Sequence, residues 1–112
     1  MKNTIKIGYS IIDIKKQSPQ FTKDNMTSNY GQYLPRENKI EIQPGLSDID
    51  EANVLLHEIL HASVWIGSLS QSGQPLEESK DEELVVNSLT NTLTQVLIDN
   101  KWVLEYLIKK LK

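Results

Sequence analysis

The sequence predicts an α+β fold: a small antiparallel three-stranded sheet packed on a buried helix, followed by a second long helix and a C-terminal helix. Two observations predict it. Alternating apolar and polar residues, which are typical of half-buried strands, are confined to residues 4–43. Apolar residues at helical spacing, preceded by helix-capping serines, occupy most of residues 47–112. A chain of 112 residues suits one domain, spanning 1–112.

Three strands are expected in the N-terminal part of the chain. Residues 4–14 alternate between isoleucines and polar or small residues, and the alternation changes phase at Ile11-Ile12, which favours a bulge or a strand end there. Residues 29–34 and 39–43 predict an antiparallel hairpin, because residues 35–38 contain the Pro and Asn that favour a turn.

The first helix is expected at residues 48–66, with Ser47 as its N-cap and Gly67 as its end. Apolar residues occupy much of its circumference, so it should be covered on more than one side. The polar segments 15–28 and 67–78 are expected to be loops.

The second helix is expected to begin near Ser79, because Ser79 and Glu82 match the capping-box pattern. It should end around residues 99–100. A last helix is expected at about residues 102–111, where apolar residues again recur at helical spacing.

Composition excludes several classes of function. The net charge of −3 and the scattered basic residues leave no electrostatic footprint for nucleic acid. No apolar run reaches membrane-spanning length, and the N-terminal residues do not resemble a signal peptide. The absence of cysteine excludes disulfides and thiolate ligands and fits a reducing, cytoplasmic location. These features do not predict the oligomeric state.

The segment His57-Glu58-Ile59-Leu60-His61 has the H-E-x-x-H spacing of a zinc site. Residues four apart lie on one face of a helix, so His57 and His61 can bind one cation. Glu58 lies about 100° around the helix and can act as general base on a water molecule. The chain has two histidines, both in this motif, and apolar residues surround them. The alternative is a metal-free pair of hydrogen-bonded histidines.

A catalytic zinc ion usually takes three protein ligands and leaves a fourth position open. With no further His and no Cys, the third ligand should be a carboxylate from Asp81, Glu82 or Glu83. We favour Glu83, because Glu82 is expected to cap Ser79, and because Glu83 shares the inward-facing stripe of its helix. In the alternative interpretation, these acids only interact with the positive end of the helix dipole.

These motifs resemble those of the ImmA/IrrE-type zinc metallopeptidases. The similarity is closer still to small zincin-like proteins of phages and prophages. It rests on the H-E-x-x-H-A segment at 57–62, the acidic helix at 83–89 and the pair Asp99-Asn100, and it covers residues 38–107. Lys101 departs from the proline that often follows the pair. A metzincin is excluded, because position 67 is Gly where that class needs a third His.

The resemblance implies a minimal zincin-like domain and a gluzincin-like metallopeptidase. Carried over residue by residue, it implies that His57, His61 and Glu83 bind Zn2+ and that Glu58 is the catalytic base. The expected partner is a peptide or protein substrate, with no nucleic acid and no membrane.

Two further features of a peptidase are expected. A tyrosine among Tyr30, Tyr33 and Tyr106 can help to hold the oxyanion. The strand at 39–43 is the expected edge for an extended substrate, because it leads directly into the metal-binding helix.

Two other interpretations remain open at this point. The chain can be a non-catalytic, metal-stabilised interaction or regulatory module of phage or prophage origin, although a structural site has no need of Glu58. It can also be a helical scaffold without metal, in which the histidines serve only packing.

Overall fold

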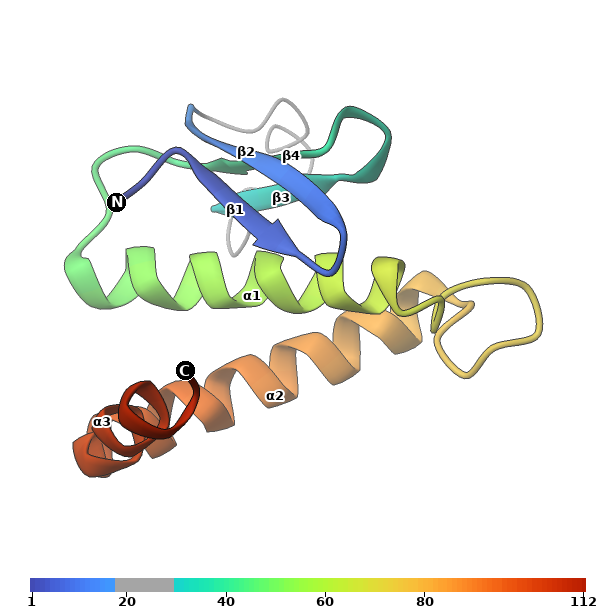
Figure 1. Ribbon diagram of the computed structural model, residues 1–112. Helices are drawn as coiled ribbons and strands as arrows, with labels where there is room; N and C mark the ends of the chain where they lie inside the picture. Colours follow the sequence, from blue (N-terminus) through green and yellow to red (C-terminus); the bar gives the residue numbers. More distant parts are fainter. Residues whose placement is uncertain (18–29) are drawn as a thin grey trace.

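The computed structural model describes residues 1–17 and 30–112. Its architecture is α+β, with a four-stranded mixed sheet and three α-helices (Figure 1). The elements in chain order are β1 (Thr4–Ile7), β2 (Ser10–Lys16), β3 (Gly31–Leu34), the 3-10 helix η2 (Pro35–Glu37), β4 (Lys39–Ile42), α1 (Asp48–Ile66), α2 (Ser79–Asp99) and α3 (Lys101–Lys110).

The N-terminal segment forms a hairpin where one long strand was expected. The turn has Gly8 as its first residue, with a φ of 58°, and Ile7 pairs with Ser10 across it. Two-residue turns of type II′ take Gly at this position, because a side chain there would be strained. The change of phase at Ile11-Ile12 therefore follows from the new strand and not from a bulge, and Ile11 points to solvent.

The strand order in the sheet is β1-β2-β4-β3. The predicted hairpin is confirmed, since β3 and β4 pair antiparallel with Gly31 opposite Ile42. The prediction of a wholly antiparallel sheet of three strands is wrong, because β2 pairs with β4 in parallel. Parallel pairing joins strands that are distant in sequence, so no local turn pattern predicts it.

This topology corrects the expected sheet edge. Residues 39–43 were expected to offer an open edge, but β4 lies between β2 and β3. Within the described residues, β3 is the strand at that end of the sheet.

The loop predicted at 15–28 begins later than expected, because β2 continues through Lys16. Residues 18–29 lie outside the described part of the chain.

The sheet packs on α1, and α2 lies against α1 on the side away from the sheet (Figure 1). The sheet contributes the isoleucine side chains that meet Ala62 of α1 in the core: Ile12, Ile14, Ile40 and Ile42. The expectation that α1 is covered on two sides is confirmed.

Within the described residues, no helix combines the length and apolarity needed to cross a membrane.

The predicted N-terminal cap of α1 is confirmed, and the one predicted for α2 is wrong. Ser47 caps α1 as expected, and its Oγ accepts a hydrogen bond from the Asp50 backbone N–H at 3.2 Å. The Ser79–Glu82 capping box is absent. Ser79 is already the first residue of α2, and the N-cap, Glu78, makes no side-chain capping bond. Glu82 is therefore free for another contact.

The interface between α1 and α2 contains polar side chains. The Asn53 side-chain amide of α1 donates to Thr94 Oγ1 of α2 at 2.9 Å. Thr90 and Val86 are buried on α2. The Thr90 hydroxyl has no hydrogen-bond partner among the described residues. A buried hydroxyl without a partner costs free energy that an apolar side chain of similar shape does not.

We expect Thr90→Val to raise the free energy of unfolding by about 1 kcal/mol, because it removes this unpaired hydroxyl. Urea denaturation measures the change. The matched control is Thr94→Val on the same helix, which should lower stability because it removes the shorter of the two hydrogen bonds that the Asn53 amide donates to α2. Destabilisation by both variants would show that Thr90 finds a partner in solution.

Candidate metal centre

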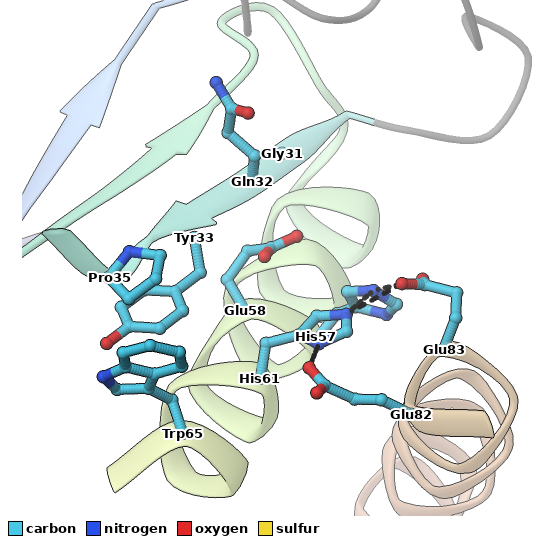
Figure 2. Close-up of a pocket in the computed structure, with 10 residues that line it drawn as sticks. All are labelled: Gly31, Gln32, Tyr33, Pro35, His57, Glu58, His61, Trp65, Glu82 and Glu83. Carbon is cyan, nitrogen blue, oxygen red and sulfur yellow. Dashed lines mark hydrogen bonds and ion pairs between the residues drawn. The ribbon is translucent and has the colours of Figure 1, made fainter. Parts of the chain in front are cut away.

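Both histidines lie on one face of α1 and point toward the start of α2 (Figure 2). They are four residues apart, which is one helical turn, so their rings meet edge to face with centroids 4.8 Å apart. The two Nε2 atoms are 3.1 Å apart. Both side chains are mostly buried, at 17% and 14% exposure. The helix thus presents two imidazole nitrogens at one point.

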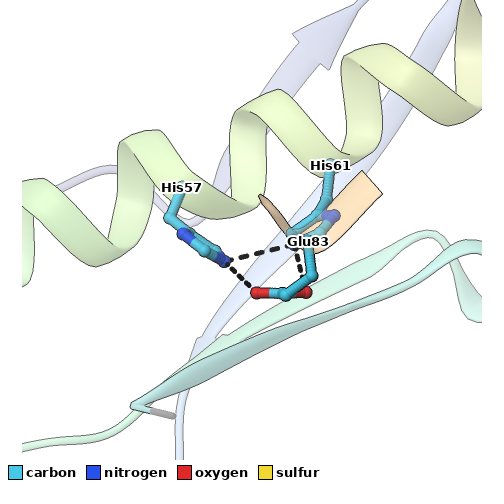
Figure 3. A group of neighbouring side chains, drawn as sticks. All are labelled: His57, His61 and Glu83. Carbon is cyan, nitrogen blue, oxygen red and sulfur yellow. Dashed lines mark hydrogen bonds and ion pairs between the residues drawn. The ribbon is translucent and has the colours of Figure 1, made fainter. Parts of the chain in front are cut away.

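Glu83 reaches the same point from α2 (Figure 3). Its Oε1 lies 3.2 Å from His57 Nε2, and its Oε2 lies 3.1 Å from His61 Nε2. The structure therefore brings together the three residues predicted as ligands, with their donor atoms all within 4.8 Å of one another. Asp81 is not part of this group.

The donor atoms fit a zinc ion. Zinc binds imidazole nitrogen and carboxylate oxygen at about 2.0–2.2 Å in tetrahedral geometry, which separates neighbouring donors by about 3.3–3.5 Å. The two Nε2 atoms, 3.1 Å apart, are slightly closer than this, and each lies 3.1 or 3.2 Å from a different oxygen of the Glu83 carboxylate. Two imidazoles and one carboxylate are also a donor set of catalytic zinc sites, in which one position stays open.

Glu82 contacts the opposite side of the His61 ring. Its Oε2 lies 2.5 Å from His61 Nδ1, the nitrogen that faces away from His57. A carboxylate at Nδ1 favours the tautomer with hydrogen there, which leaves Nε2 free to bind a cation. Capping was therefore the wrong reason to prefer Glu83 over Glu82. The difference between them is which ring nitrogen each carboxylate meets.

The carboxylates also change the protonation of His61. Burial alone lowers the pKa of His61, but the hydrogen bonds that its ring donates to Glu83 and Glu82 outweigh burial and raise that pKa to about 9. The same contacts with His57 and His61 hold the pKa of Glu83 well below its usual range. Without a cation, the cluster is therefore a set of ion pairs with a proton on His61.

Glu58 lies on α1 and turns toward β3, away from Glu83 (Figure 2). It is 4% exposed, and burial raises the pKa of its carboxyl to about 7, although the two histidines act in the opposite direction. Among the described residues, no side chain donates a hydrogen bond to this carboxylate. A buried carboxylate with a pKa near neutrality has the properties of a general acid–base group.

Gly31 allows β3 to pass directly over Glu58. A Cβ at this position would lie 2.7 Å from Val54 Cγ1 and 3.3 Å from Glu58 Oε2. Any side chain would therefore displace the strand or the carboxylate. The sequence analysis did not single out this glycine. A glycine that begins a strand is a weak signal of close backbone approach.

A cavity of about 330 Å³ opens beside the cluster, between α1, β3 and the start of α2. Of the three candidate tyrosines, Tyr33 lines this cavity, whereas Tyr30 and Tyr106 do not. Trp65 also lines it, although the sequence analysis missed this residue. Its spacing was the available signal, because it follows His61 by four residues on the same helix face. The full lining comprises Gly31, Gln32, Tyr33, Pro35, His57, Glu58, His61, Trp65, Glu82 and Glu83.

Comparison of the chain with protein-family models, with curated proteins and with solved structures finds no match. The assignment of the site therefore rests on its residues and their geometry.

We expect His57→Ala and Glu83→Ala to abolish tight zinc binding, because each removes one of three ligands. Glu82→Gln should weaken binding by about 10- to 100-fold, the usual effect of losing an outer partner of a ligand histidine. Isothermal titration calorimetry with a competing chelator measures these affinities. Asp81→Asn is the matched control, since it removes a neighbouring charge outside the cluster. Equal losses in all four variants would indicate a general charge effect.

We also expect zinc affinity to rise with pH between about 6 and 8. The raised pKa of His61, about 9, means that zinc must displace a proton over this whole range. Each proton displaced lowers the apparent affinity by up to about tenfold per pH unit below that pKa. Proton release is measured by calorimetry in buffers of different ionisation enthalpy. An affinity that stays constant from pH 6 to 8 would contradict the protonated state of the cluster.

Proposed function

We propose that this protein is a zinc-dependent metallopeptidase that hydrolyses peptide bonds, built as a minimal zincin-like domain. The observation that supports it most strongly is the position of Glu58. A site that binds metal only for structure does not need a buried carboxylate of this kind beside the ligands. Here that carboxylate lines the same cavity as His57, His61 and Glu83.

The side chains have separate roles in this proposal. Zinc, when bound, supplies Lewis-acid chemistry that polarises a carbonyl oxygen and acidifies water. Glu58 accepts a proton from the attacking water and later donates it to the leaving amine, which a carboxyl group with a pKa near 7 can do in both directions. Glu82 orients the His61 ring through Nδ1.

Tyr33 is the residue that we propose to stabilise the oxyanion. It lines the cavity together with Glu58, and burial raises the pKa of its phenol. The hydroxyl group therefore keeps its hydrogen at neutral pH and can donate to a negatively charged oxygen. No third histidine exists in the chain to take this role.

The geometry of β3 supports a peptide as the substrate. Within the described residues, β3 pairs with β4 alone, and its first three residues line the cavity. An extended peptide can add to such an edge through backbone hydrogen bonds, which bring its carbonyl groups past the metal cluster. This edge replaces the one expected at residues 39–43.

A second candidate function is a metal-stabilised interaction module of phage or prophage origin without catalysis. Large exposed apolar side chains on α3 and at its C-cap favour it: Trp102, Ile108 and Leu111 are 64%, 70% and 75% exposed. Such exposure is typical of surfaces that meet another protein. In this case the metal would hold α1 and α2 together, and Glu58 would have no function.

We expect Glu58→Gln to keep the fold and the bound zinc but to lower peptide hydrolysis by about 10²- to 10⁴-fold, because it removes the proton acceptor. The measurement is cleavage of a mixed library of quenched fluorescent peptides by the zinc-loaded protein. Metal content and circular dichroism are recorded in parallel. Glu105→Gln on exposed α3 is the control and should cleave as the unmodified chain does.

Two results would contradict the proposed function. The first is that the zinc-loaded, unmodified chain cleaves no peptide in the library. The second is that Glu58→Gln cleaves as fast as Glu105→Gln. Either result would favour the interaction module.

A further inference from the structure

A second cavity, of about 160 Å³, adjoins the metal cavity. Tyr33 and Trp65 line both cavities and therefore stand between them. In Figure 2 these two rings and Pro35 lie together on one side of Glu58, whereas Glu82 and Glu83 lie on the other. The remaining lining of the second cavity comes from Tyr9, Ser10, Asn38, Ile66, Ser68 and Gln71.

The distance from the metal cluster suits a residue close to the reacting bond. Trp65 follows His61 by four residues, which is a rise of about 6 Å along α1. An extended peptide rises about 3.3 Å per residue, so about two of its residues span this distance. A peptide lying along β3 with a carbonyl at the cluster therefore brings the side chain about two residues away to Trp65.

The two cavities differ in charge. Glu58, Glu82 and Glu83 line the metal cavity. Among the described residues, the second cavity has aromatic, hydroxyl, amide and aliphatic side chains and no charged one. A charged side chain that entered it would lose water without gaining an ionic partner, which is unfavourable. This lining selects an uncharged group.

The size of the cavity suits one aromatic ring. A protein cavity of about 150 Å³ is large enough to bind benzene, and this one measures about 160 Å³. Trp65 is 52% exposed, an unusual state for a large apolar side chain that faces a cavity. Aromatic pairs gain further from edge and face contacts.

We propose that the second cavity is a specificity subsite for an uncharged aromatic side chain, Phe or Tyr, about two residues from the scissile bond of the substrate. Trp65 and Tyr33 form its walls. This inference rests on the proposed peptidase function and names the class of peptide that the site takes.

The first test needs neither zinc nor hydrolysis. The chain has two tryptophans, Trp65 and Trp102, so its indole N–H signals in NMR spectra are assigned with Trp65→Phe and Trp102→Phe. Titration with N-acetyl-phenylalanine amide should shift the Trp65 signal saturably and leave the Trp102 signal unchanged. N-acetyl-lysine amide at the same concentrations should shift neither.

Variants then test the walls of the subsite by ligand-observed NMR. Trp65→Ala should weaken binding of N-acetyl-phenylalanine amide by about tenfold, whereas Trp65→Phe should retain most of it. Trp102→Ala is the matched control, because Trp102 is similarly exposed on α3. Equal binding of the two amides, or an equal shift of both indole signals, would overturn the subsite.

The second test joins the subsite to cleavage. Among library peptides cut by the zinc-loaded chain, those with Phe or Tyr about two residues from the cut should predominate, and Trp65→Ala should remove that preference. Cleavage with the same preference in Trp65→Ala would overturn the inference. If the amide binds at Trp65 but no peptide is cut, the peptidase function fails and the aromatic site stands.

Discussion

The contact between the Glu83 carboxylate of α2 and the two imidazoles of α1 is the interaction on which the site depends. It joins two helices that are separated by a polar loop, where it gives the mostly buried histidines an ionic partner. The carboxylate and the histidines compensate each other, which is why the pKa values of His61 and Glu83 move in opposite directions.

A single helix positions most of the site, because successive residues are about 100° apart around the helix axis and therefore face different neighbours. His57 and His61 face α2, while Glu58 turns toward the sheet and lies under β3. Within the same motif, α2 therefore contacts the histidines, whereas the sheet packs on Glu58. Contact with α2 completes the set of donors and orients His61. The sheet buries Glu58 and leaves room for it at Gly31.

One of the two reasons for preferring Glu83 as a ligand was wrong, although Glu83 does meet both histidines. Glu83 was preferred partly because Glu82 was expected to cap Ser79, yet the helix begins one residue too early for that. The inward stripe was the sounder observation, since Glu83 and the buried pair Val86 and Thr90 share it. Glu82 makes its contact at the other ring nitrogen, which only the placement of the ring reveals.

The sequence by itself determined the helices, the β3–β4 hairpin and the motif, because helical periodicity, the Ser47 cap, the turn residues and the H-E-x-x-H spacing are local properties of the chain. Tertiary structure decided what local patterns do not contain. Parallel pairing placed β4 inside the sheet and left β3 over the cavity, since strands distant in sequence meet without a turn signal. Packing of α1 against α2 likewise decided which nitrogen each carboxylate meets. Trp65 lies on the same face of α1 as His61, because the two residues are four apart. Only the tertiary structure shows that its ring lines both cavities.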